Sequence, residues 1–162
     1  MSETSGDFIV NETYMREAIQ LASSAKEHGN HPFGALFVVD DEIVIRAENS
    51  VLTKKNSSHH AESNLMNLIS ESSLTKDQIA RGIVYTSTEP CAMCCGAIYW
   101  GGVRKIVYGC PTGVLADIAG DDFAIPCRSI FSVAKKTPVQ VVGPVLEEEA
   151  VKVHIGFWDQ EA

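Results

Sequence analysis

A histidine, a glutamate and two cysteines have the types and spacing that could bind a metal and move a proton. His60 precedes Glu62 by two positions, and Cys91 and Cys94 form a C-x-x-C pair further along the chain. One imidazole and two thiolates are ligands that zinc prefers, and they leave its fourth position to water, as in catalytic sites. Zinc lowers the pKa of such a water to about 7, so a nearby carboxylate such as Glu62 can take up its proton.

Each half of this pattern also has an ordinary explanation. A C-x-x-C can be a redox pair or two packed cysteines, His60 a buried structural histidine, and Glu62 a surface charge. A zinc-stabilised binding module is another alternative, with Cys95, Cys110 or His59 as the fourth ligand. On a helix, however, Cys95 points about 100° away from its neighbour in the pair, and redox chemistry leaves His60 and Glu62 unused. H-x-E followed by P-C-x-x-C is the signature of the zinc deaminases, and we take it as the prediction.

Composition and charge limit the class of protein. The chain has 162 residues, 45% hydrophobic and 21% charged, which predicts a single globular domain over residues 1–162. It lacks an apolar run of membrane-spanning length and a signal peptide, so we expect no membrane association and a cytoplasmic location. The net charge of −8 argues against a nucleic-acid partner and favours a small uncharged substrate. Five cysteines, an odd number, favour metal binding or thiol chemistry over disulfides.

The elements that position these residues follow from periodicity. Apolar spacing predicts a helix from about Glu12 to His28, and two apolar runs at 33–39 and 42–48 predict a hairpin whose strands are both buried. A helix follows from residue 60, with Ser57 or Ser58 as its cap.

The second half of the chain alternates strands with helices. Strands are predicted at 82–88, 103–109 and 139–143, with a helix after Pro90, an irregular stretch near 110–127, and a closing helix from Leu146 to Trp158. Strand–helix–strand crossovers imply parallel pairing of the last three strands. We therefore predict an α/β fold, a three-layer α/β/α sandwich with a five-stranded mixed sheet. The two helix starts with the candidate ligands then share one sheet end.

Several segments carry a resemblance to a known family. "HAE" and "EPCAMC" resemble the cytidine deaminase-like superfamily, and "PFGALFV", "AEN", "TSTEPCAMCCGAIYWGGVRKIVYG" and "GDDF" look most like its guanine deaminase and nucleoside deaminase branch. That branch is related to tRNA adenosine deaminases and fungal cytosine deaminases. The resemblance implies the same sandwich fold, zinc held by His60, Cys91 and Cys94, and Glu62 as the catalytic proton shuttle.

The resemblance also implies substrate contacts. They are Asn49 and the backbone N–H of Ala61 on the ring, Phe33 as an aromatic wall, and Asp122 on the amino edge of a purine. Asp121 is the alternative to Asp122, because this chain reads "IAGDDF" where the guanine enzymes read "AGFDD". Trp158 resembles part of the substrate lid of the cytosine deaminases, or else it anchors the last helix in the core.

The implied reaction is hydrolytic deamination of a free nucleobase or nucleoside. Guanine, converted to xanthine and ammonia by attack at C2, is the substrate that we expect. Cytosine and other amino-heterocycles, such as a triazine or a pterin, stay open, whereas acidity and the absence of a basic C-terminal tail argue against tRNA adenosine. Relatives are usually dimers, so a homodimer is expected, and the apolar "AIYWGG" segment belongs to an interface or to the core.

Overall fold

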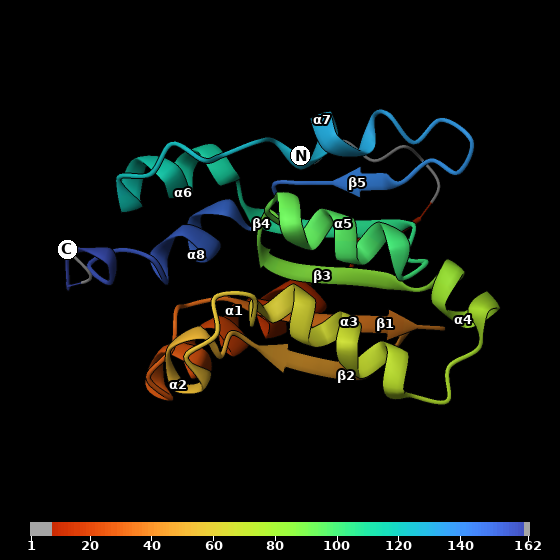
Figure 1. The fold of residues 1–162 in the computed structure, drawn as a ribbon, viewed down its shortest axis with the longest axis horizontal. Helices are drawn as coiled ribbons and strands as arrows, with labels where there is room; N and C mark the ends of the chain where they lie inside the picture. The colour runs from red at the N-terminus through yellow and green to blue at the C-terminus, as the bar shows by residue number, and fades with distance from the viewer. Residues whose placement is uncertain (1–7, 161–162) are drawn as a thin grey trace.

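A five-stranded mixed sheet forms the centre of the structure, a computed structural model that describes residues 8–160 (Figure 1). Its strand order is β2-β1-β3-β4-β5. The strands are β1 (Gly34–Val39), β2 (Glu42–Glu48), β3 (Ile83–Thr88), β4 (Lys105–Cys110) and β5 (Gln140–Val142). β1 pairs antiparallel with β2 and β3, while β3, β4 and β5 run parallel, as the crossovers predict.

Helices cover both faces of this sheet. They are α1 (Glu12–Glu27), α2 (Val51–Lys54), α3 (Ala61–Glu71), α4 (Lys76–Arg81), α5 (Ala92–Trp100), α6 (Thr112–Ala119), α7 (Cys127–Phe131), α8 (Glu147–Lys152) and the 3-10 helix η1 (Trp158–Gln160). α3, α5 and α7 pack on one face, and α1 and α8 on the other, so the three-layer prediction is confirmed. Among residues 8–160, no helix has the length and apolar character needed to cross a bilayer.

The predicted hairpin joins β1 to β2. Asp40 and Asp41 have φ of 52° and 62°, the positive values of the type I′ turns that match the twist of paired strands. All six residues of β1 are buried, but in β2 only Ala47 is. The expectation that both strands are buried is therefore wrong for β2, because it is an edge strand that the helical layers leave partly exposed.

Three other expectations differ from the structure. The stretch near 110–127 that the sequence indicated as irregular contains α6, and α7 begins at its end. The short helix α2 was not predicted. The closing helix stops at Lys152, because turns replace helical hydrogen bonding from there and Gly156 adopts a left-handed φ of 83°. His60 itself, not Ser57 or Ser58, is the N-cap of α3, with extended backbone angles of −71° and 158°.

Candidate active site

The starts of α3 and α5 bring the candidate zinc ligands together. His60 is the N-cap of α3, Cys91 is the N-cap of α5, and Cys94 lies in the first turn of α5. Both helices begin at the same end of the sheet, beyond the carboxyl end of β3. A helix N-terminus favours negative charge, so the position of the cysteines favours their thiolate forms.

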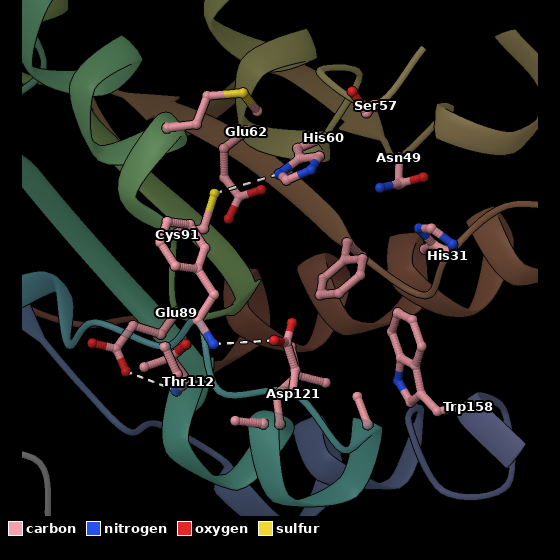
Figure 2. Close-up of a pocket in the computed structure, with 17 residues that line it drawn as sticks. His31, Asn49, Ser57, His60, Glu62, Glu89, Cys91, Thr112, Asp121 and Trp158 are labelled. Atoms are coloured by element: carbon pink, nitrogen blue, oxygen red, sulfur yellow. Dashed lines mark hydrogen bonds between the residues drawn. The ribbon is translucent and has the colours of Figure 1, made fainter. Parts of the chain in front are cut away.

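The distances match a tetrahedral zinc site. His60 Nδ1 lies 3.5 Å from Cys91 Sγ and 3.6 Å from Cys94 Sγ, and the three ligand atoms lie within 4.8 Å of one another (Figure 2). With Zn–S about 2.3 Å and Zn–N about 2.0–2.1 Å, tetrahedral angles separate nitrogen from sulfur by about 3.6 Å. These three residues are positioned to bind zinc.

The protonation of the cysteine pair also suits a metal. The thiol of Cys94 donates a hydrogen bond to Cys91, and with a further contribution from His60 this lowers the pKa of Cys91 to about 4. The same hydrogen bond, together with burial, raises the pKa of Cys94. Zinc takes cysteine as the thiolate, so zinc binding at this pair is coupled to loss of the thiol protons.

Glu62 is a buried carboxylate beside this ligand set. It lies in the first turn of α3, its side chain is 5% exposed, and the Thr86 hydroxyl donates to its Oε2 at 3.1 Å. Burial raises the pKa of Glu62 to about 7, with a smaller contribution from the charge on Cys91. A carboxyl group with such a pKa can both accept and release a proton near neutral pH.

A cavity of about 420 Å³ opens in front of these residues. Its lining combines zinc ligands, acidic groups, aromatic rings and one side of α6: His31, Phe33, Asn49, Ser57, His60, Glu62, Glu89, Cys91, Met93, Thr112, Leu115, Ala116, Ala119, Asp121, Phe123, Ala124 and Trp158. Figure 2 shows Cys91 and Trp158 on opposite sides of this cavity. A molecule bound in the cavity would therefore have the metal site on one side and the aromatic ring of Trp158 on the other.

Asn49 and Phe33, two of the predicted substrate contacts, line the cavity. Asn49 is 2% exposed, and its Oδ1 accepts the Val51 N–H at 3.0 Å. That bond assigns the amide orientation and leaves the NH₂ group to donate. Phe33 packs against His154 and Trp158, with ring centroids 5.3 Å and 6.0 Å away.

Two expected substrate contacts do not line the cavity. Ala61 is fully buried, so its backbone N–H is the group that it has to offer. Asp121, not Asp122, is the aspartate on the wall, because Gly120 caps the end of α6 in a left-handed conformation (φ 73°) and the next residue turns inward. Asp121 Oδ1 accepts the N–H groups of Asp122 and Phe123, which fixes the turn.

Sequence reasoning missed much of the cavity wall. The residues of α6 were overlooked because their segment was read as irregular, although Ala119 and Gly120 carry a helix-end signal. Glu89 was overlooked although it directly precedes the P-C-x-x-C motif. His31, two positions before Phe33, had no pattern that distinguished it from a surface histidine.

The rejected alternatives for a fourth protein ligand lie elsewhere. Cys95 is fully buried in the core, where its thiol donates to the carbonyl oxygen of Pro90 at 3.5 Å. His59 lies 3.4 Å from the Ser50 hydroxyl and does not line the cavity. Among residues 8–160, the cluster with metal-ligand geometry contains His60 and the two motif cysteines, and neither of these alternatives.

Comparison with known proteins identifies relatives with this site region. A family model described as the cytidine and deoxycytidylate deaminase zinc-binding region matches residues 9–110. A probable cytosine deaminase of Schizosaccharomyces pombe is 36% identical, with 90% of this chain and 91% of the relative covered. A guanine deaminase of Bacillus subtilis is 34% identical (69% and 72% covered), and a tRNA-specific adenosine deaminase 2 of Xenopus tropicalis is 29% identical (93% and 89%).

The same fold occurs in a solved structure. A guanine deaminase from Nitrosomonas europaea superimposes with a TM-score of 0.77 at 21% identity, over 95% of this chain and 86% of that one. The family match covers the helix starts that hold the zinc ligands, and the sequence similarity extends over most of the chain. The chain therefore belongs to the cytidine and deoxycytidylate deaminase family and is a zinc-dependent deaminase of the nucleobase and nucleoside class.

Proposed function

We propose that this deaminase acts on a free purine base of the guanine type and converts guanine to xanthine and ammonia. The observation that carries the reaction type is the buried carboxylate of Glu62 beside the zinc ligands, at the wall of the cavity. The acidic side chain of Asp121 on the same wall supports the purine assignment, because it can accept hydrogen bonds from an N–H edge.

The chemistry follows from the positions of the side chains. Zinc, when bound, would lower the pKa of a water molecule in its fourth position to about 7. Glu62 takes up a proton from the attacking water, and then delivers protons to the ring nitrogen and to the leaving amine. Asn49 donates to the ring through its NH₂ group, and the cavity wall excludes competing water. Water and the amino base thus become ammonia and the oxo base.

Glu62→Gln tests the proposed proton shuttle. Glutamine keeps the shape of the side chain but cannot cycle a proton, so we expect turnover to fall by about 10²–10⁴-fold while zinc stays bound. An ammonia-release screen of free bases, nucleosides and related heterocycles gives the turnover, and elemental analysis gives the zinc content. Substantial activity in Glu62→Gln would remove the residue from this role, and no released ammonia from any base would refute the proposed substrate class.

Cytosine is the second candidate, because the relative from Schizosaccharomyces pombe matches 90% of the chain. Asp121→Asn separates the two. Loss of a charge-assisted hydrogen bond should lower kcat/KM for guanine by about 10–100-fold and leave that for cytosine nearly unchanged. Asp122→Asn, one position away and off the cavity wall, is the matched control. Equal losses on both bases would contradict the proposed contact with the purine edge.

A tRNA adenosine substrate fits less well. The relative from Xenopus tropicalis carries a tRNA-specific name, but this chain has a net charge of −8. Binding of a long polyanion normally relies on a basic surface. The proposed partner is therefore a small molecule, and a tRNA anticodon arm included in the screen should release no ammonia.

We also propose a homodimer and a cytoplasmic location. Trp100 at the end of α5 is 84% exposed, so the apolar "AIYWGG" segment has a free surface at its end. Trp100→Glu should shift the mass in sedimentation equilibrium towards the monomer, and an unchanged mass would place the interface elsewhere.

The proposed cytoplasmic location is supported by the cysteines. All five are unpaired thiols, as expected in a reducing compartment.

A further inference from the structure

A buried histidine outside the zinc site connects the C-terminal segment to the sheet. His154 follows α8 and is 0% exposed. Its Nε2 lies 2.8 Å from Thr88 Oγ1 at the end of β3, and its Nδ1 lies 3.2 Å from Trp158 Nε1. An indole N–H can only donate, so Nδ1 of His154 must accept. The ring proton is therefore on Nε2, which donates to the hydroxyl of Thr88.

Apart from this hydrogen bond, the indole of Trp158 is held by ring packing. It lies in the three-residue 3-10 helix η1, after a turn in which Gly156 has a φ of 83°. Its indole is half-buried and lies at ring-centroid distances of 5.2 Å from His31 and 6.0 Å from Phe33. Ring packing restrains the indole, but the bond to His154 is the directional contact that fixes how it faces the cavity.

The orientation of this indole matters for a planar ligand. Trp158 lines the cavity on the side away from Cys91 (Figure 2). Aromatic side chains bind bases by stacking, and the gain depends on how the ring faces are placed. A correctly held indole would therefore help to bind the base without touching the reacting carbon.

We propose that His154 is a positioning residue, which holds the indole of Trp158 in the orientation that receives the base. This inference rests on the proposed function, because it takes the cavity to be the deaminase active site. It assigns to His154 and Thr88 an effect on substrate affinity that acts through Trp158 and leaves the proton transfers of Glu62 unchanged.

The protonation state of His154 fits this role. Burial, with a smaller contribution from the positive charge of Lys26, lowers its pKa to about 4. Lys26 is in α1, and its Nζ donates to the carbonyl oxygen of Val153 at 3.3 Å, so its positive charge lies next to the residue before His154. At neutral pH the imidazole is therefore uncharged, and its Nδ1 lone pair is available to Trp158.

The test isolates the signal of Trp158. The chain has two tryptophans, and Trp100 is 84% exposed, so Trp100→Phe leaves Trp158 as the single tryptophan, which can be excited selectively over the tyrosines. In this background His154→Phe removes the acceptor, and His154→Asn restores one, since Asn Oδ1 lies near the position of Nδ1. In the ligand-free protein we expect His154→Phe to increase acrylamide quenching of Trp158, and His154→Asn to return it towards the parent value.

Kinetics with the base that the ammonia screen identifies provide the second readout. His154→Phe should raise KM about five- to tenfold, the effect of one lost hydrogen bond, and leave kcat within about twofold. His154→Asn should recover most of the KM. If His154→Phe does not fold, Thr88→Val, which removes only the partner of Nε2, should give smaller changes of the same sign in both readouts.

The outcomes separate the two proposals. Unchanged quenching in the folded variants, or a fall in kcat with KM unchanged, would overturn the positioning role. Changed quenching without any deaminated base would support the bond between His154 and Trp158 while refuting the proposed function. Failure of His154→Asn to rescue either readout would also contradict the role, because the acceptor would then not be the property that matters.

Discussion

At the scale of single residues, the two cysteine ligands differ from their neighbour Cys95 in the direction of the side chain and not in its chemistry. Cys91 and Cys94 face His60, whereas Cys95 points into the core. We expect Cys91→Ser and Cys94→Ser to lose most of the bound zinc, because a hydroxyl is a poor replacement for a thiolate ligand. Cys95→Ala is the control and should keep its zinc. Elemental analysis after dialysis measures the metal, and zinc loss in the control equal to that in the ligand variants would argue against this ligand set.

Direction also explains which site residues the sequence could predict. Residues two or three apart at a helix start have nearly fixed relative directions, so spacing relates Cys91 to Cys94 and His60 to Glu62. The order of strands and helices places both helix starts at one end of the sheet, and this brings His60 to the cysteine pair. Asp121 could not, because its position depends on the residue at which α6 ends, and a shift by one residue exchanges it with Asp122. Spacing carried no information about contacts between distant segments.

At the scale of elements, Glu89 connects three helix starts. It lies two residues before the N-cap of α5, and its carboxylate accepts the N–H of Thr112 in α6 at 2.8 Å and the N–H of Cys127 in α7 at 2.6 Å. The N-caps of α6 and α7 are both prolines without side-chain capping bonds. Glu89 therefore replaces the missing caps, and a carboxylate is favoured there by both helix dipoles.

Glu89→Gln should loosen both helices. The amide retains one acceptor but turns an NH₂ group towards the other backbone N–H, so we expect the free energy of unfolding to fall by about 1–3 kcal/mol. Hydrogen exchange should become faster over residues 112–131, whereas α1 should keep its protection and the zinc content should not change. Equal acceleration in α1 would indicate general destabilisation, and unchanged exchange over 112–131 would contradict the capping role.

The same contacts show why some elements escaped prediction. The long helices and the strands carry their own periodicity, and all five strands were found near their observed positions. α7 has five residues and α6 eight, too few for a clear apolar stripe, and Glu89 stabilises both from a distant part of the chain. Short helices held by tertiary contacts give little local signal.

At the scale of the whole molecule, the C-terminal segment closes back on the sheet through a neutral buried histidine. His154 contacts Thr88 of β3, Phe33 before β1 and Trp158 of η1. The predicted closing helix would have extended through this region, whereas the observed turn buries His154 instead. Folding must therefore bury an imidazole in its uncharged form, so the stability of the whole chain should depend on pH.

The sign of that dependence follows from the two pKa values of His154. The pKa is near the ordinary 6.5 in the unfolded chain and about 4 in the folded one, so below pH 6.5 the unfolded chain binds a proton that the folded chain does not. Acid therefore favours unfolding, and between pH 7.5 and 4.5 His154 should cost roughly 2–3 kcal/mol of stability. His154→Asn, which has nothing to protonate, should lose that much less over the same range. Urea unfolding of both proteins at the two pH values measures the difference, which also cancels the carboxylates common to both. Parallel losses would mean that His154 is not kept neutral by folding, and its Nδ1 would then not be a dependable acceptor for Trp158.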